Sequence, residues 1–292
     1  MYDSSTLEVV QENWAFDMRN RFFYYQTASH SFGISLAVTQ DGKFTGLDLG
    51  DNYPRGIRMY SYDKDEMLSK EIYYFKTRHG TEEKSPAQVV YDRYDEISTS
   101  DKSFYKWSND NDVYTELGAS GFIETDDGYI VFFLSETPSL DNQYTGEILN
   151  TPRNLGFTKI SKDLQTKLSP GIKETGGFFT FNGAWTELTN EGISYLTDFK
   201  DLKFTLSRLK NVKITDKLIL LLFEIWDPDN YSSTGYMIVD TDGNAKSKIQ
   251  ILCYPLRLFR ADDPLYVKDG SIFMVSGESD GRLSTYKIDI TI

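Results

Sequence analysis

The sequence predicts an all-β protein built from repeated antiparallel hairpins, and three observations support this fold class. Tyr and Phe are abundant, with 20 and 19 copies in 292 residues, and aromatic rings suit a pleated, half-buried surface. Asp-Gly pairs stand between short apolar segments, and this dipeptide favours the tight turns of hairpins. Helical segments of the kind that connect parallel strands are almost absent, which argues against an α/β fold.

Four stretches share one plan: a short apolar strand, a tight turn and a second, more continuously apolar strand. We expect these inner hairpins at 34–49, 121–134, 212–223 and 264–275. A continuous apolar run indicates a strand that is covered on both faces. More polar strand pairs are expected to follow, at 56–63 with 67–76 and at 235–244 with 245–252, and a last alternating strand at 283–290.

Repeated hairpin units of this kind predict one β-propeller domain over residues 1–292, with about five blades and a range of four to six. A propeller must join its ends, so we expect a strand near 21–26 to complete the C-terminal blade. One short surface helix is predicted near 86–97, because Ser85 suits a helix cap and Pro86 the first helical position.

Several segments resemble a loosely defined group of repeat-bearing β-propeller proteins. The resemblance lies in the segments 29–33, 47–57, 114–118, 207–209, 222–226 and 257–263. It implies the propeller fold and carries over no catalytic residue, because that group has no assigned activity. The short segment 1–28 departs from the cleaner first blade of such proteins, which leaves the number of blades open.

The charge balance excludes several classes of partner. The chain carries 31 basic and 44 acidic residues, a formal net charge of −13, so nucleic acid and anionic membranes are not expected to bind it.

The longest apolar run, 218–223, is too short for a membrane span. Cys253 is the only cysteine, which rules out an internal disulfide. No signal peptide is expected at the N-terminus, and the interpretation is a soluble protein, either cytoplasmic or secreted and processed.

Two groups of polar residues are candidates for ligand binding. The first, Asp48, Asp51, Tyr53 and Arg55, follows an apolar strand and could receive a sugar hydroxyl, a cation or a carboxylate; ordinary turn chemistry explains it as well.

The second group falls where we expect the strands of neighbouring blades to end or begin. It comprises Arg208, Glu224, Trp226, Arg257, Arg260, Asp262 and Asp263. These residues could line the mouth of a central channel, or form a belt of ion pairs between blades. His30 is a further binding candidate. Composition leaves a Ser/His/Asp triad through it open, but no nucleophile elbow is present, and a histidine that fixes a turn through hydrogen bonds is the favoured explanation.

Metal sites have little support in the sequence. The chain has two histidines and one cysteine, too few for structural zinc. The segments 109–112, 227–230 and 240–244 are rich in oxygen ligands, but none matches an EF-hand loop. We therefore expect no cofactor and leave calcium open.

Because no catalytic motif is present, the sequence favours a non-enzymatic recognition scaffold. Such a propeller would bind a protein or a glycan through its loops and channel mouth. Two alternatives remain: a carbohydrate-active hydrolase or lyase that uses carboxylates near the channel, and a structural subunit of a larger assembly.

Overall fold

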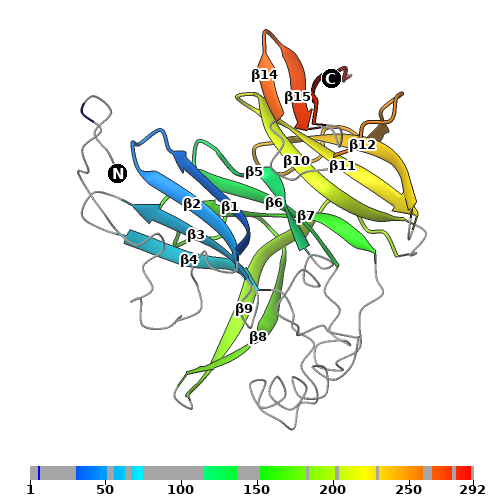
Figure 1. Ribbon diagram of the computed structural model, residues 1–292. Coiled ribbons are helices and arrows are strands. Elements are labelled where there is room, and N and C mark those ends of the chain that lie inside the picture. The colour runs from blue at the N-terminus through cyan, green and yellow to red at the C-terminus, as the bar shows by residue number, and fades with distance from the viewer. Residues whose placement is uncertain are drawn as a thin grey trace.

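The computed structural model describes a chain made of strands, turns and loops (Figure 1). The part of the chain that it describes contains no helix, and therefore no helix that could cross a membrane. The described residues are 6, 31–50, 56–62, 67–74, 115–136, 152–181, 184–200, 204–227, 230–258, 265–277 and 281–290. The all-β prediction is confirmed for these residues, whereas the expected helix near 86–97 and the strand near 21–26 lie outside them.

The strands form four antiparallel sheets. In chain order they are β1 (Ser31–Val38), β2 (Phe44–Gly50), β3 (Gly56–Tyr62), β4 (Met67–Tyr74), β5 (Thr115–Glu124), β6 (Gly128–Glu136), β7 (Arg153–Ser161), β8 (Ile172–Phe181), β9 (Ala184–Tyr195), β10 (Thr205–Thr215), β11 (Leu218–Asp227), β12 (Asn230–Asp240), β13 (Gln250–Ile251), β14 (Leu265–Lys268), β15 (Ser271–Gly277) and β16 (Leu283–Ile288). Their spatial orders are β1-β2-β3-β4, β5-β6-β7-β9-β8, β10-β11-β12-β13 and β14-β15-β16.

All four predicted inner hairpins are confirmed. They are the pairs β1–β2, β5–β6, β10–β11 and β14–β15. The predicted pairing of β3 with β4 is also present, and β12 pairs with β13 over two residues only, a shorter pairing than expected. Local turn chemistry explains this success: Gly42 and Gly270 adopt φ values of +80° and +73°, which a glycine reaches without steric cost.

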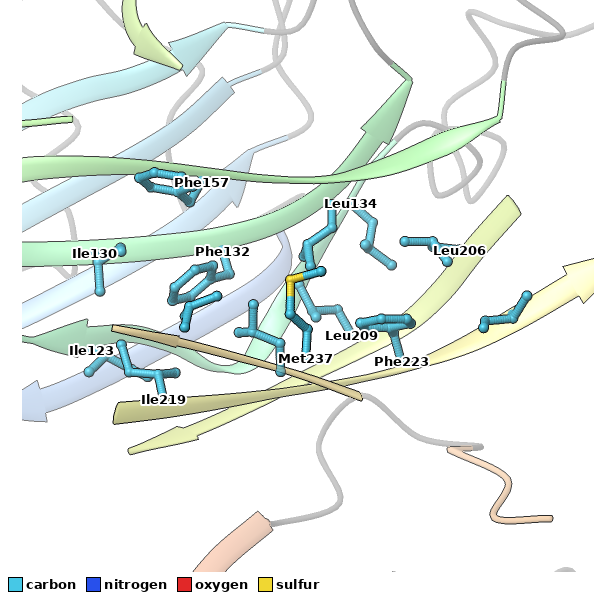
Figure 2. Close-up of a cluster of buried hydrophobic side chains, with 14 residues drawn as sticks. Ile123, Ile130, Phe132, Leu134, Phe157, Leu206, Leu209, Ile219, Phe223 and Met237 are labelled. Atoms are coloured by element: carbon cyan, nitrogen blue, oxygen red, sulfur yellow. The ribbon is translucent and has the colours of Figure 1, made fainter. Parts of the chain in front are cut away.

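The sheets pack face to face in the order in which the chain makes them. One hydrophobic cluster joins the β1–β4 sheet to the β5–β9 sheet, a second joins the latter to the β10–β13 sheet, and a third joins that to the β14–β16 sheet. Figure 2 shows the second cluster, in which Phe132 and Phe157 lie opposite Phe223 and Met237. The two middle sheets are therefore covered on both faces.

This double coverage accounts for the continuous apolar runs in β6 and β11. The side chains of Ile130 to Leu134 and of Ile219 to Phe223 are fully buried. Burying one large aliphatic or aromatic side chain contributes roughly 1.5–3 kcal/mol, so these two strands supply much of the free energy that holds the sheets together.

The antiparallel connections give each sheet two different ends. Tight turns at 39–43, 125–128, 161–166, 215–218 and 240–244 lie at one end, which we call the turn end. At the opposite end, which we call the loop end, β2, β6 and β11 finish and β3, β7 and β12 begin. The loop ends of two successive sheets also meet. The backbone amide of Arg153, which begins β7, donates to the hydroxyl of Thr205, which begins β10, at 3.0 Å.

Candidate functional site

The loop end of the β10–β13 sheet holds a polar and aromatic cluster made of Glu224, Trp226, Tyr231 and Arg257. We call it the Arg257 cluster. Glu224 and Trp226 end β11, Tyr231 begins β12 opposite Trp226, and Arg257 follows β13. Glu224 is in register with Thr234 on β12 and with Ser207 on β10.

Glu224 is the buried centre of this cluster, with a side chain that is 0% exposed. One carboxylate oxygen accepts from the Arg257 Nε at 3.1 Å and from the amide of Leu258 at 2.6 Å; the other accepts from the Trp226 indole Nε1 at 2.8 Å. Three hydrogen-bond donors offset the free-energy cost of burying this carboxylate. Its environment suits a supporting group that fixes its neighbours, and does not suit a proton donor that must reach a substrate.

Arg257 lies over two aromatic rings. Its guanidinium carbon is 4.4 Å from the centre of the Tyr231 ring and 5.3 Å from that of Trp226. The two rings meet edge to face at 6.4 Å. These distances fall in the range of cation–π attraction, so the rings and Glu224 together fix a guanidinium whose side chain is still 34% exposed.

Tyr231 is itself anchored. Its hydroxyl lies 2.9 Å from the Thr234 hydroxyl, which donates to the carbonyl of Leu256 at 2.5 Å. Leu256 precedes Arg257 in the sequence, so these two hydrogen bonds help to position both Tyr231 and Arg257. The result is a pre-arranged surface of one cation and two rings, with polar atoms already satisfied beneath it.

Arg208 is exposed and lies near this cluster in the sheet. It belongs to a bulge of β10 between Ser207 and Lys210, and its φ is +61°. Such a φ is uncommon outside glycine, and bulges redirect side chains at functional edges. The structure thus places Arg208, Glu224 and Trp226 in one region of one sheet.

The first predicted group cannot be assembled in the same way. Asp48 lies in β2 with Arg58 as its register partner on β3. The other predicted residues, His30, Asp51, Tyr53, Arg55, Arg260 and Asp262, lie outside the described residues. Asp51, Tyr53 and Arg55 belong to the connection from β2 to β3, and Arg260 and Asp262 to the connection from β13 to β14.

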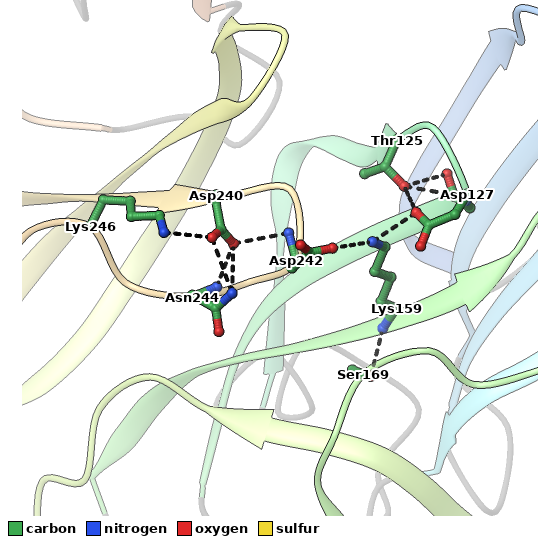
Figure 3. Close-up of polar contacts among 9 residues, drawn as sticks. Thr125, Asp127, Lys159, Ser169, Asp240, Asp242, Asn244 and Lys246 are labelled. Carbon is green, nitrogen blue, oxygen red and sulfur yellow. Dashed lines mark hydrogen bonds and ion pairs between the residues drawn. The ribbon is translucent and has the colours of Figure 1, made fainter.

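A second polar network lies at the turn end, and the sequence did not predict it. The Lys159 Nζ is 2.8 Å from Asp127 and 2.8 Å from Asp242, so one lysine joins two sheets (Figure 3). Burial opposes its charge, yet the bonds to both carboxylates raise the pKa of Lys159. Partial burial likewise opposes ionisation of Asp127, but its bonds with Lys159 and Thr125 lower its pKa.

The turn that carries Asp242 is closed by Asp240. This carboxylate accepts from the amides of Asp242 and Asn244 at 3.0 and 2.8 Å and pairs with Lys246 at 2.8 Å. Burial raises the pKa of Asp240, but the bonds from Lys246 and Asn244 outweigh it and lower the pKa to about 2. In this candidate calcium segment, the Asp240 carboxylate is thus already occupied by protein donors.

Two further observations concern metal sites. Within the described residues, no group of three or more His, Cys, Asp or Glu side chains is placed to hold a metal ion. The candidate segment 109–112 lies outside those residues, and 227–230 is described only at its two ends.

Sequence reasoning missed Tyr231 as a member of the Arg257 cluster. One signal was available, because Trp226 and Tyr231 flank the short connection between β11 and β12, and hairpin register places such flanking residues opposite each other. The Lys159 bridge had no comparable signal, since Lys159 and Asp242 are far apart in the chain.

Comparisons with known proteins give a mixed result. Neither protein-family models nor curated proteins match the chain. Among solved structures, an α-L-arabinanase of Penicillium chrysogenum complexed with arabinobiose matches at 8% identity and a TM-score of 0.29, covering 89% of this chain and 78% of that one. A GH93 α-L-arabinofuranosidase of Fusarium graminearum with arabinobiose matches at 11% identity and a TM-score of 0.30, covering 89% and 81%. An α-L-arabinofuranosidase of the same fungus with an iminosugar inhibitor matches at 9% identity and a TM-score of 0.29, covering 85% and 75%.

These matches correct the function that the sequence favoured. We expected a non-enzymatic recognition scaffold, and the solved structures that match are glycoside-cleaving enzymes instead. The scaffold interpretation was therefore wrong. At these TM-scores no residue, pocket or substrate is transferred from those enzymes to this chain.

Proposed function

We propose that the chain is a carbohydrate-active hydrolase that binds its substrate at the loop end of its sheets. The observation that carries the proposal is the Arg257 cluster. A sugar presents hydroxyl oxygens that accept hydrogen bonds and ring faces that are apolar. A fixed guanidinium beside two aromatic rings offers a partner for both kinds of group.

The hydrolytic step is assigned to carboxylates outside the Arg257 cluster. Glycoside hydrolysis commonly uses a pair of carboxylates, one as acid and one as base or nucleophile. Glu224 is unsuited to either role because its oxygens are buried and occupied. We assign the pair to Asp51 and Asp262, whose connections join strands at the loop end, and we assign substrate binding to Arg257.

A panel of polysaccharides that includes arabinan tests this function through the release of reducing ends. We expect release from at least one polymer, loss of release in Asp51→Asn and in Asp262→Asn, and a raised KM in Arg257→Ala. Asp269→Asn is the matched control, because Asp269 lies in the turn between β14 and β15 at the opposite end. Retained activity in both loop-end variants, or no release from any polymer, would reject the assignment.

No metal is required for this chemistry, so we expect EDTA to leave the rate unchanged. A rate that falls with EDTA and returns with calcium would instead assign calcium to the site.

We also propose that the four sheets are blades of one β-propeller over residues 1–292, with about five blades in all. Support comes from contacts between strands of successive sheets: β1 contacts β5, β5 contacts β10, and β10 contacts β14. Successive contacts of this kind suit strands gathered around one axis. An experimental structure that pairs residues 21–26 with β16 would complete the ring; one that leaves the four sheets as an open stack would reject it.

A further inference from the structure

The hairpin of β8 and β9 differs from the other strand pairs of the molecule. Over most of its length each strand pairs only with the other, and β9 joins the sheet only through Ile193 to Tyr195, which pair with β7, among the described residues. Figure 1 shows this hairpin extending away from the sheets. A ribbon of two strands is marginally stable in water and gains stability from a third strand or a packed face.

The part of this ribbon that lies farthest from β7 lacks the usual protection against strand pairing. From Thr175 to Thr186 the chain carries no charged residue and no proline. That stretch holds four aromatic residues, Phe178, Phe179, Phe181 and Trp185. Exposed strand edges are normally blunted by charge, proline, bulges or brevity; in β8 the charged residues Lys173 and Glu174 and both register shifts come before residue 178, so residues 178–181 carry no charge, proline or bulge.

Among the described residues, β8 is an edge strand of its sheet. It stands last in the order β5-β6-β7-β9-β8, whereas the other side of the ribbon is obstructed at its base, where β9 meets β7. The edge strand β4 of the neighbouring sheet carries Lys70 and Glu71 near its middle, whereas the charged residues of β8, Lys173 and Glu174, lie near its start.

We propose that β8 pairs antiparallel with β8 of a second copy of this chain, so that two ribbons form one four-stranded sheet across a two-fold axis. An edge that pairs with itself gives a closed, self-complementary dimer. The chain has a net charge of −13, which opposes self-association at most surfaces. The uncharged stretch is a place where two identical strands meet without like charges opposite each other, and aromatic pairs across strands add stability.

Sedimentation of the full-length protein over a dilution series tests the proposal. We expect a mass twice the 33.6 kDa of one chain, falling to that of one chain in Phe179→Lys, because lysines then oppose each other across the axis. Thr180→Lys is the second variant, since it adds the same charge at a polar position of β8. Thr285→Lys, at an exposed position of β16, is the matched control and should remain a dimer.

Circular dichroism keeps the result interpretable by showing which variants are folded. A folded Phe179→Lys or Thr180→Lys protein that still has the mass of a dimer would overturn the proposal. So would a wild-type protein that has the mass of one chain at every concentration, in which case β8 is covered within the chain or by a different partner.

Discussion

Each end of the sheets has a deeply buried charged side chain at its centre, Lys159 at one end and Glu224 at the other, and the sign and the surroundings of the two differ. At the turn end the Lys159 side chain is 4% exposed, while its partners Asp127 and Asp242 are 57% and 69% exposed. At the loop end the carboxylate of Glu224 is 0% exposed and its partner Arg257 is 34% exposed. The carboxylates of Asp127 and Asp242 therefore remain largely hydrated, whereas the carboxylate of Glu224 has no contact with water.

This difference indicates different roles. The Lys159 bridge joins turns of two sheets, so it holds the molecule together where the connections are short. The Arg257 cluster lies within one sheet and the segment that follows it, and it fixes a cation and two rings. One buried charge therefore joins two sheets, and the other holds the Arg257 cluster together.

Removing Glu224 is expected to have the largest effect. Glu224→Ala should lower the free energy of unfolding by about 3–5 kcal/mol, because it leaves three buried or half-buried donors without their acceptor. Glu224→Gln keeps one acceptor oxygen and should cost roughly 1–3 kcal/mol. Chemical denaturation measures both. If the alanine variant lost less than the glutamine variant, Glu224 would not be the support of the cluster.

The turn at Gly243 offers a comparison with the similar turn at Gly42. Both glycines have positive φ, +84° and +80°, so alanine strains either position by about 1 kcal/mol. A Cβ at Gly243 would also lie 2.3 Å from the buried Phe157 ring, whereas one at Gly42 meets no atom within 4 Å. We expect Gly243→Ala to lose about 2–3 kcal/mol in the same measurement, and equal losses would show that the Phe157 contact is not tight.

Removing Lys159 tests the turn end. Lys159→Met should lower the free energy of unfolding by only about 1–2 kcal/mol, because the two carboxylates left behind are exposed and regain water. The control is Lys200→Met, whose side chain is 82% exposed beside Asp198 and should change stability by less than about 0.5 kcal/mol. A loss as large as that of Glu224→Ala would erase the difference between the two ends.

Acid sensitivity is a further effect that we expect to arise at the turn end. The pKa of Asp240 is about 2 in the folded protein and 3.8 as its ordinary value. Asp240 therefore stabilises the fold fully above pH 3.8, and this contribution is lost as the pH falls toward 2. Asp240→Asn should flatten the decline in stability over that interval in unfolding curves taken at each pH. An unchanged slope would contradict the assigned pKa.

Much of the candidate site was visible in the sequence as residue types, and little of it as geometry. Trp226 and Glu224 stand out because they end the most apolar strand, and Arg257 because it begins the next unit. Nothing in the sequence shows that Arg257 lies over Tyr231, or that Glu224 accepts from the amide of Leu258. Those contacts join residues 26 to 34 positions apart, and they exist only once β11, β12 and the segment after β13 lie side by side.

The sequence by itself determined the hairpins and which strands are covered on both faces. Turn residues such as Asp41-Gly42 act on their immediate neighbours, and side-chain alternation or its absence records burial directly. Only the tertiary structure decided that β9 lies between β7 and β8, that Lys159 reaches Asp242, and that Glu224 supports Arg257. Such contacts depend on how whole sheets stack, and stacking is set by the summed packing of many apolar side chains, which no short stretch of sequence specifies.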